Sequence, residues 1–175
     1  MEDASGFPEL MKLYNKFPMK ELIIHPRVQK DFYKNTPNLE MFAEAFAMST
    51  NPVCYNGDIF CMEDHQRICE RFPELDAVMS GRGTLMNPAL AREIRGGQAL
   101  TKAELRKFHD LVYHTYRAEV SGDRNVLFKM KELWFYMEPL FANNKKYLKK
   151  IKKSEKCIVY ESAVAELFSN EELIL

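Results

Sequence analysis

Short apolar runs alternate with amphipathic segments through the first half of this chain of 175 residues. Strands are predicted near residues 21–25, 52–55 and 77–80. Helices are predicted near residues 7–17, 39–48 and 63–72, with another that starts at Asn87 as N-cap and Pro88 as first helical residue. A strand–helix alternation of this kind is typical of an α/β fold with a parallel sheet.

The strand signals stop after the sequence RGGQAL, Arg95–Leu100. Thr101 and Glu104 have the spacing of a capping box, and helical patterns then continue to about Phe168. The sequence therefore predicts two domains, an α/β domain over residues 1–97 and an all-α domain over residues 98–175.

The composition and the start of the chain argue against a membrane protein and against a secreted one. The apolar runs are too short to span a bilayer, and the acidic start Met1-Glu2-Asp3 lacks the features of a signal peptide. These observations predict a cytoplasmic protein with no membrane partner. The cysteines show no CxxC spacing, so we expect reduced core thiols instead of disulfides or metal ligands; they are Cys54, Cys61, Cys69 and Cys157.

Polar residues follow each predicted strand. The first is followed by His25 and Arg27, the second by Asn56-Gly57-Asp58, and the third by Gly81-Arg82-Gly83. In parallel α/β folds ligands lie beyond the carboxyl ends of the strands, and a glycine backbone with an arginine suits a phosphate. A structural histidine and simple turns are the alternative interpretation of each motif alone. Their occurrence at successive strand ends favours a phosphate-bearing cofactor.

The second half carries a basic segment. Residues 124–156 contain ten basic and three acidic side chains, an excess of seven. Helical spacing allows five lysines to form a surface for a nucleic-acid backbone: Lys129, Lys131, Lys145, Lys149 and Lys152. A solvated amphipathic helix is the alternative. Aromatic residues nearby are expected to be core, although they could stack on bases: Phe128, Trp134, Phe135 and Tyr136.

The segments ELIIHPRVQKDFYK, NPVCYNGDIF, VMSGRGTLMNPALAREIRGG and GDRNVLFKMKELWFYM resemble the later part of tRNA-dihydrouridine synthases. The resemblance implies the later part of an FMN-binding (β/α)8 TIM barrel followed by a C-terminal helical tRNA-binding domain. It also implies NADPH-dependent reduction of a uridine in tRNA. FMN contacts are implied for His25, Asn56, Gly57, Asp58, Gly81 and Arg82. Arg27 falls where the family has a basic residue near the substrate.

Three strands cannot close a barrel that takes about 250 residues, so we expect an N-terminally truncated chain. The catalytic cysteine of the family has no match here, no catalytic residue is assigned, and the chain alone is expected to lack activity. Two alternatives stay open: a non-catalytic RNA-binding protein, and another FMN-dependent TIM-barrel oxidoreductase. The sequence sets neither the target uridine nor an oligomeric state.

Overall fold

The computed structural model describes residues 6–31 and 34–174. The acidic start Met1–Asp3 lies outside the described residues. The chain forms two compact units, Met1–Gly81 and Arg82–Leu175, and each is described by itself.

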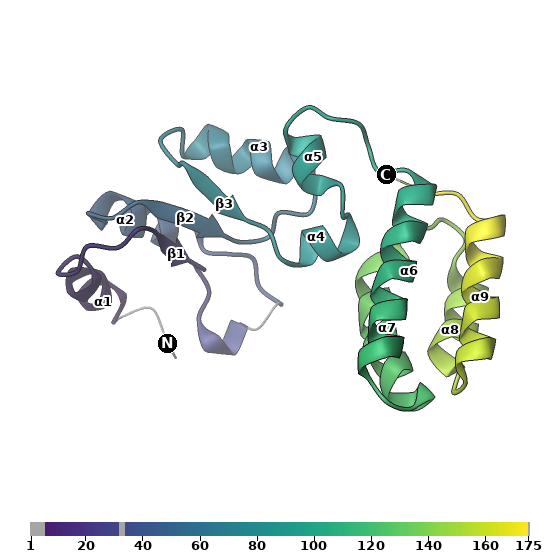
Figure 1. The fold of residues 1–175 in the computed structure, drawn as a ribbon. Helices are drawn as coiled ribbons and strands as arrows, with labels where there is room; N and C mark the ends of the chain where they lie inside the picture. The colour runs from purple at the N-terminus through teal and green to yellow at the C-terminus, as the bar shows by residue number, and fades with distance from the viewer. Residues whose placement is uncertain (1–5, 32–33, 175) are drawn as a thin grey trace. The chain divides into compact units, whose positions relative to one another are not determined.

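A three-stranded parallel sheet lies at the centre of the first unit (Figure 1). Its strands are β1 (Leu22–Ile24), β2 (Val53–Asn56) and β3 (Ala77–Met79), in the order β1-β2-β3. Both neighbours pair with β2 in parallel, and Ile24 lies opposite Tyr55 while Asn56 lies opposite Met79. The parallel α/β prediction is confirmed, and the carboxyl ends of all three strands lie at one edge.

Helices precede or connect these strands. They are α1 (Phe7–Tyr14), η1 (Gln29–Asp31), α2 (Leu39–Met48) and α3 (Met62–Arg71). The Asn38 side chain caps α2 by accepting from the Met41 backbone N–H at 3.0 Å. The Phe42 ring packs edge-on against Tyr55 of β2 and Phe72 beyond α3, with ring centroids 4.8 and 4.9 Å apart. These aromatic contacts hold α2 and α3 on the sheet.

The helix after β3 differs from the sequence prediction. A helix begins already at Arg82, and the pair α4 (Arg82–Met86) and α5 (Leu90–Ile94) replaces the helix expected to start at Asn87 and Pro88. Asn87 is buried between them, accepting from the Ala89 backbone N–H (2.9 Å) and donating to Glu93 (2.8 Å). The prediction was wrong because α4, despite containing Gly83, packs on a later helix, α7 (Asp123–Met137), and tertiary packing overrides local preference.

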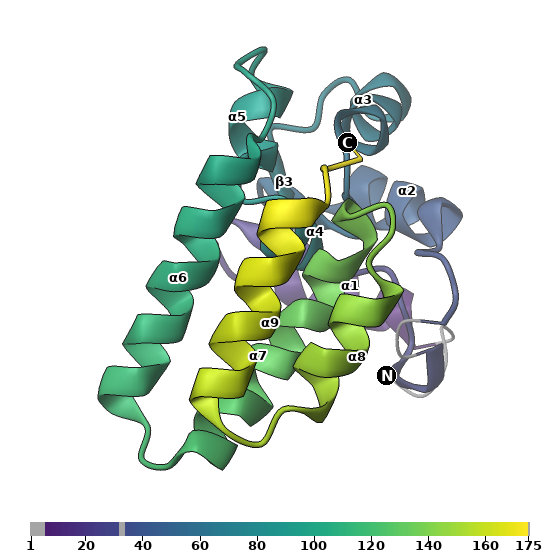
Figure 2. The same cartoon turned by 90° about the vertical axis from the view of Figure 1, so that its right-hand side faces the viewer.

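The second unit is helical (Figure 2). After α4 and α5 it contains α6 (Lys102–Glu119), α7 (Asp123–Met137), η2 (Glu138–Leu140), α8 (Lys145–Lys153) and α9 (Cys157–Asn170). The predicted capping box of Thr101 and Glu104 begins α6. Gly122 precedes α7 with φ +84°, a left-handed conformation that suits glycine.

The division between the units falls earlier than Gly97, where the sequence analysis placed it. Ala89 and Leu100 are buried in the helical core, and Met86 packs against it. The segment that links the last strand to α6 therefore belongs to the helical unit by its packing. That residues 1–97 form a barrel portion and residues 98–175 an RNA-binding domain stays a prediction.

The four cysteines are free thiols with different environments. Cys54 and Cys157 are buried, as expected, and Cys69 is partly buried. Cys61 is exposed, contrary to the expected core position, because it is the N-cap residue of α3.

Candidate functional site

The ends of β1 and β2 are joined through His25. Its Nδ1 lies 2.7 Å from the backbone carbonyl oxygen of Asn56. A carbonyl can only accept, so Nδ1 carries a proton and donates it to this bond. The sequence prediction that these two residues share one edge of the sheet is thus matched by a direct hydrogen bond.

Arg27 lies beneath this edge instead of at its surface. Its Nη1 and Nη2 donate to the two carboxylate oxygens of Asp58 at 3.1 and 2.5 Å, and Nε and Nη2 donate to the Asn35 carbonyl at 2.8 and 2.5 Å. Only 2% of the Arg27 side chain is exposed. The guanidinium therefore joins the loop after β1 to the loop after β2, whereas the sequence analysis expected it to face a substrate.

The side chain of Tyr55, two residues earlier, leaves no room for a side chain at position 57, which is therefore glycine. A Cβ atom on Gly57 would collide with the Tyr55 ring and its hydroxyl group. Burial, with a smaller contribution from Asp58, raises the pKa of Tyr55 to about 12, so the phenol stays neutral. The backbone of the Asn56-Gly57-Asp58 loop thus rests directly on a buried aromatic side chain.

The end of β3 is connected to the same loop. The Ser80 hydroxyl donates to the Ile59 carbonyl at 2.9 Å. At Gly81 an added Cβ would meet no heavy atom of the described residues within 4 Å, so a ligand can approach this backbone closely. Arg82 follows as the first residue of α4 and of the second unit, with its side chain half-buried.

The predicted lysines fall into two groups. Lys129, Lys145 and Lys149 are exposed. Lys131 donates to the Ser154 carbonyl at 2.7 Å, and Lys152 forms an ion pair with Glu138 at 2.5 Å. Two of the five lysines thus have a partner within the helical unit, although Lys152 is exposed as well, and a shared RNA surface stays a prediction.

The aromatic residues of α7 also divide. Trp134 is fully buried, which confirms its core position, and Tyr136 is partly buried. Phe128 and Phe135 are 69% and 67% exposed. The core interpretation was wrong for these two because α7 buries only one of its faces.

Sequence reasoning missed a buried polar chain around His109. The Trp134 indole N–H donates to the Tyr160 hydroxyl, which donates to His109 Nε2, both at 2.7 Å. Nδ1 of His109 then donates to Asp110 at 2.8 Å, and Arg106 donates to both oxygens of that carboxylate. Burial, opposed by Asp110, lowers the pKa of His109 to about 4. No motif signals this chain, because its partners lie on three different helices.

The described part of the chain contains neither a candidate membrane-spanning helix nor a candidate metal-binding cluster. None of its helices has the length and apolar character needed to cross a bilayer. No cluster of three or more His, Cys, Asp or Glu side chains there is placed to hold a metal ion.

The chain was compared with known proteins. The family model for dihydrouridine synthase (Dus) matches residues 8–171. A tRNA-dihydrouridine(16) synthase of Shewanella oneidensis is 34% identical over 55% of this chain and 30% of its own length. That of Aquipseudomonas alcaligenes is 30% identical over 45% of the chain and 25% of its own length. A probable tRNA-dihydrouridine synthase of Helicobacter pylori is 27% identical over 73% of the chain and 39% of its own length.

The chain thus spans between a quarter and two fifths of the length of these relatives. The family match extends from the first helix to the last and includes both the strand ends and the lysine-rich helices. On this match, the chain belongs to the dihydrouridine synthase family.

Proposed function

We propose that this chain contributes the later strands and a helical RNA-binding unit to an FMN-dependent tRNA-dihydrouridine synthase. The observation that carries the proposal is the meeting of polar groups at successive parallel strand ends, His25 with Asn56 and Arg27 with Asp58, in a chain of this family. Such strand ends are the usual ligand site of parallel α/β folds. We also propose a cytoplasmic location, because the relatives are named for the modification of tRNA.

The residues present suit a phosphate-bearing flavin. Gly81 leaves its backbone open to close approach, Gly57 follows β2 at the same edge of the sheet, and Arg82 supplies a cation with bidentate geometry. Asn56 and His25 supply a side-chain amide and an imidazole at the same edge. These residues and Asp58 are the proposed FMN contacts.

Bound FMN would supply the hydride for the uracil ring after its own reduction by NADPH. The chain's own residues would hold and orient it. In this proposal Arg27 has a supporting role: its buried guanidinium holds Asp58 and hence the Asn56-Gly57 loop in place. None of the four cysteines is assigned as the proton donor.

The RNA would contact the exposed lysines of the helical unit. Lys129, Lys145 and Lys149 are exposed and suit phosphate oxygens. Lys131 and Lys152 would contribute less, because each already has a partner within the unit. Binding of this kind should weaken steeply as the salt concentration rises.

A chimera tests the proposal. Residues 8–171, the range matched by the family model, would replace the corresponding part of the Shewanella oneidensis relative, which aligns with this chain over 96 residues. The product would be assayed with NADPH and unmodified tRNA by mass spectrometry of dihydrouridine. We expect a yellow protein that forms dihydrouridine. A chimera that binds FMN and tRNA yet reduces no uridine would contradict the proposal. A reaction with a small-molecule acceptor in its place would favour another FMN-dependent oxidoreductase.

A further inference from the structure

Met79, the last residue of β3, is exposed at the carboxyl edge of the sheet. It is 39% exposed, whereas Val78 before it is partly buried. Successive side chains of a strand point to opposite faces of the sheet, so Met79 lies on the face opposite to Val78. The faces of parallel sheets are usually covered, and an accessible methionine on one of them is a departure from that rule. An apolar side chain thus lies open at the same edge as the proposed FMN contacts.

The face that carries Met79 is the one turned away from α2. The Tyr55 ring packs against Phe42 of α2, so the Tyr55 side chain lies on the helix side of the sheet. Asn56 follows Tyr55 and therefore lies on the other side. The register places Met79 directly opposite Asn56, and residues opposite one another in neighbouring strands share a face. Asn56 and Met79 are thus neighbours on the face away from α2.

His25 extends this arrangement to the first strand. It follows Ile24, which lies opposite Tyr55, and its Nδ1 donates to the Asn56 carbonyl at 2.7 Å. His25, Asn56 and Met79 therefore lie side by side at the ends of the three strands, and we call them the strand-end row. Its first and last members are two strand spacings apart, about 10 Å. The row is polar on β1 and β2 and apolar on β3.

The same face is apolar beneath the strand-end row. Two residues earlier in each strand, Ile23 lies opposite Cys54, and Cys54 lies opposite Ala77. Ile23 is 46% exposed. A ligand on this face therefore meets polar side chains at the strand-end row and apolar ones below it.

Resting on the proposed function, we propose that Met79 contacts the isoalloxazine ring of FMN and positions it beside His25 and Asn56. FMN consists of a charged phosphate, a polar ribityl chain and a flat aromatic ring. The proposed phosphate contacts, Gly81 and Arg82, follow Met79 by two and three residues. A thioether adapts its shape to an aromatic ring and makes favourable sulfur contacts with it. The ring is thus the part of FMN that an accessible methionine at this edge suits.

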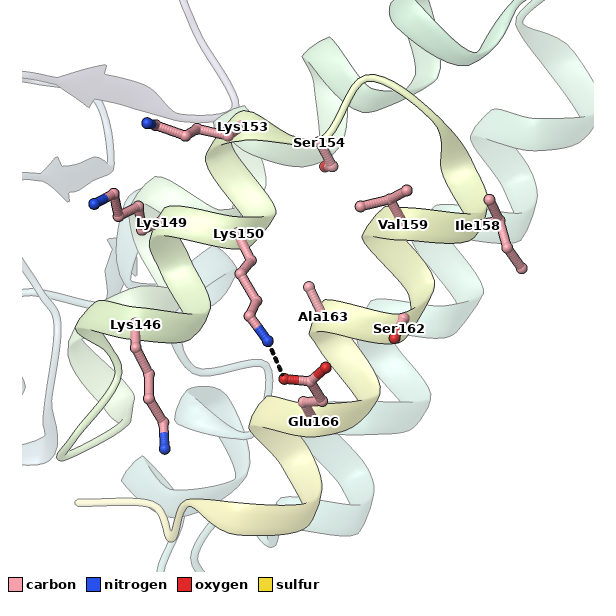
Figure 3. Close-up of a pocket in the computed structure, with 10 residues that line it drawn as sticks. All are labelled: Lys146, Lys149, Lys150, Lys153, Ser154, Ile158, Val159, Ser162, Ala163 and Glu166. Carbon is pink, nitrogen blue, oxygen red and sulfur yellow. Dashed lines mark hydrogen bonds and ion pairs between the residues drawn. The ribbon is translucent and has the colours of Figure 1, made fainter.

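A second place in the chain could accept an anionic aromatic ligand. A groove of about 800 Å³ runs between α8 and α9, with Lys149 and Lys153 on one side and Val159 and Ala163 on the other (Figure 3). No methionine is among the described residues that line this groove. Flavin bound there would leave the methionine methyl groups without a direct contact. Methionine signals therefore distinguish the strand edge from the groove.

The test is NMR of the 175-residue chain with carbon-13-labelled methionine methyl groups, titrated with FMN to millimolar concentration. Riboflavin supplies the ring without the phosphate, and ribose 5-phosphate supplies a phosphate without the ring. We expect FMN and riboflavin to shift the Met79 methyl signal upfield through the ring current, FMN at the lower concentration, and ribose 5-phosphate to leave it in place. Met79→Leu assigns the signal by its loss. Met48, which ends α2 shortly before β2 begins, lies at the opposite edge and is the internal control.

The affinity for each flavin separates the ring contact from the phosphate contact. Met79→Ala should weaken FMN and riboflavin by the same factor, roughly three- to tenfold. Arg82→Ala should weaken FMN only, because riboflavin has no phosphate. Ile23→Ala, at a similarly exposed position on the same face but one row deeper, is the matched control and should bind both flavins like the parent.

Failure of the ring contact differs from failure of the cofactor site. If FMN shifts the backbone amide signal of Gly81 and leaves the Met79 methyl signal in place, the ring contact is wrong and the proposed FMN site survives. Equal riboflavin affinities of the parent and Met79→Ala would overturn the ring contact in the same way. If neither signal responds to FMN at any concentration, this chain holds no FMN site and both proposals fail.

Discussion

Arg27 and Asp58 meet at two points, Nη1 to Oδ1 at 3.1 Å and Nη2 to Oδ2 at 2.5 Å, although 31 residues separate them in the sequence. Because the guanidinium is buried, loss of Asp58 would leave its charge without this carboxylate, and loss of Arg27 would remove the hydrogen bonds that join Asp58 to the Asn35 carbonyl. This pair is the main polar connection that the structure shows between the loops that follow β1 and β2.

Arg27→Ala should therefore lower the free energy of unfolding by about 3 kcal/mol. Arg71→Ala is the matched control in the same unit, since Arg71 forms an exposed ion pair with Glu40 at 2.5 Å and should cost at most about 1 kcal/mol. Urea unfolding followed by circular dichroism measures both. Equal losses in the two variants would show that the buried pair has no special role.

Gly57→Ala should be destabilising by roughly 1–3 kcal/mol, because its new methyl group collides with the Tyr55 ring. Gly81→Ala, whose methyl group meets open space, should leave stability unchanged or raise it by about 0.5 kcal/mol. Thermal unfolding of the two variants distinguishes these effects. A stable Gly57→Ala protein would mean that Tyr55 moves aside easily.

Stability should fall as the pH decreases from about 6.5 to about 4, through His109. Its pKa is lowered in the folded state by burial, so in this range the unfolded chain binds a proton that the native chain does not. The contribution is fully present above pH 6.5 and amounts to about 3 kcal/mol. Asp110 and Arg106 on α6 and Tyr160 on α9 are the charged and titratable groups bonded within this chain.

Unfolding midpoints in urea between pH 4 and 7 measure this dependence. His109→Gln should lose much of the slope in that interval, at a cost in stability at pH 7. His114→Gln, an exposed position on the same helix, serves as the control; His114 is the smallest of the named causes that lower the pKa of His109, so the variant should keep most of the parent's slope. A His109→Gln profile parallel to that of the parent would assign the dependence to other groups.

Arg82→Ala in the chimera should weaken FMN binding by about 2–3 kcal/mol, or roughly 30- to 150-fold, if the guanidinium contacts the cofactor phosphate. Folding should be largely unaffected. Fluorescence titration of FMN into the two apoproteins measures the difference, and equal affinities would exclude the phosphate role.

The sequence predicted best those elements that depend on interactions between residues close together in the chain. The strand at Val53–Asn56 and the helix at Leu39–Met48 follow from apolar periodicity and turn residues, and the structure has them within a residue or two of the predicted limits. The capping box of Thr101 and Glu104 spans three residues, so its pattern is visible without a fold.

Long-range partners could not be predicted in the same way. The sequence His25-Pro26-Arg27 does not reveal that Arg27 pairs with Asp58. Arg27 was expected near a substrate, but its buried side chain instead holds the loop after β2. The helix at Arg82 forms against α7, which lies 41 residues later. Phe128 is exposed and Trp134 is buried although both lie on α7, because only one face of this helix packs against the core.

The central place of β2 has a consequence for local dynamics. Its backbone is paired on both sides, and Val53, Cys54 and Tyr55 are all buried. Opening this strand requires both ladders to break together, so its amide protons should exchange with deuterium more slowly than those of β1 and β3. The Asn56-Gly57-Asp58 loop is thus anchored to the strand of the sheet that should open most slowly, and it would keep its shape through fluctuations that expose the flanking strands.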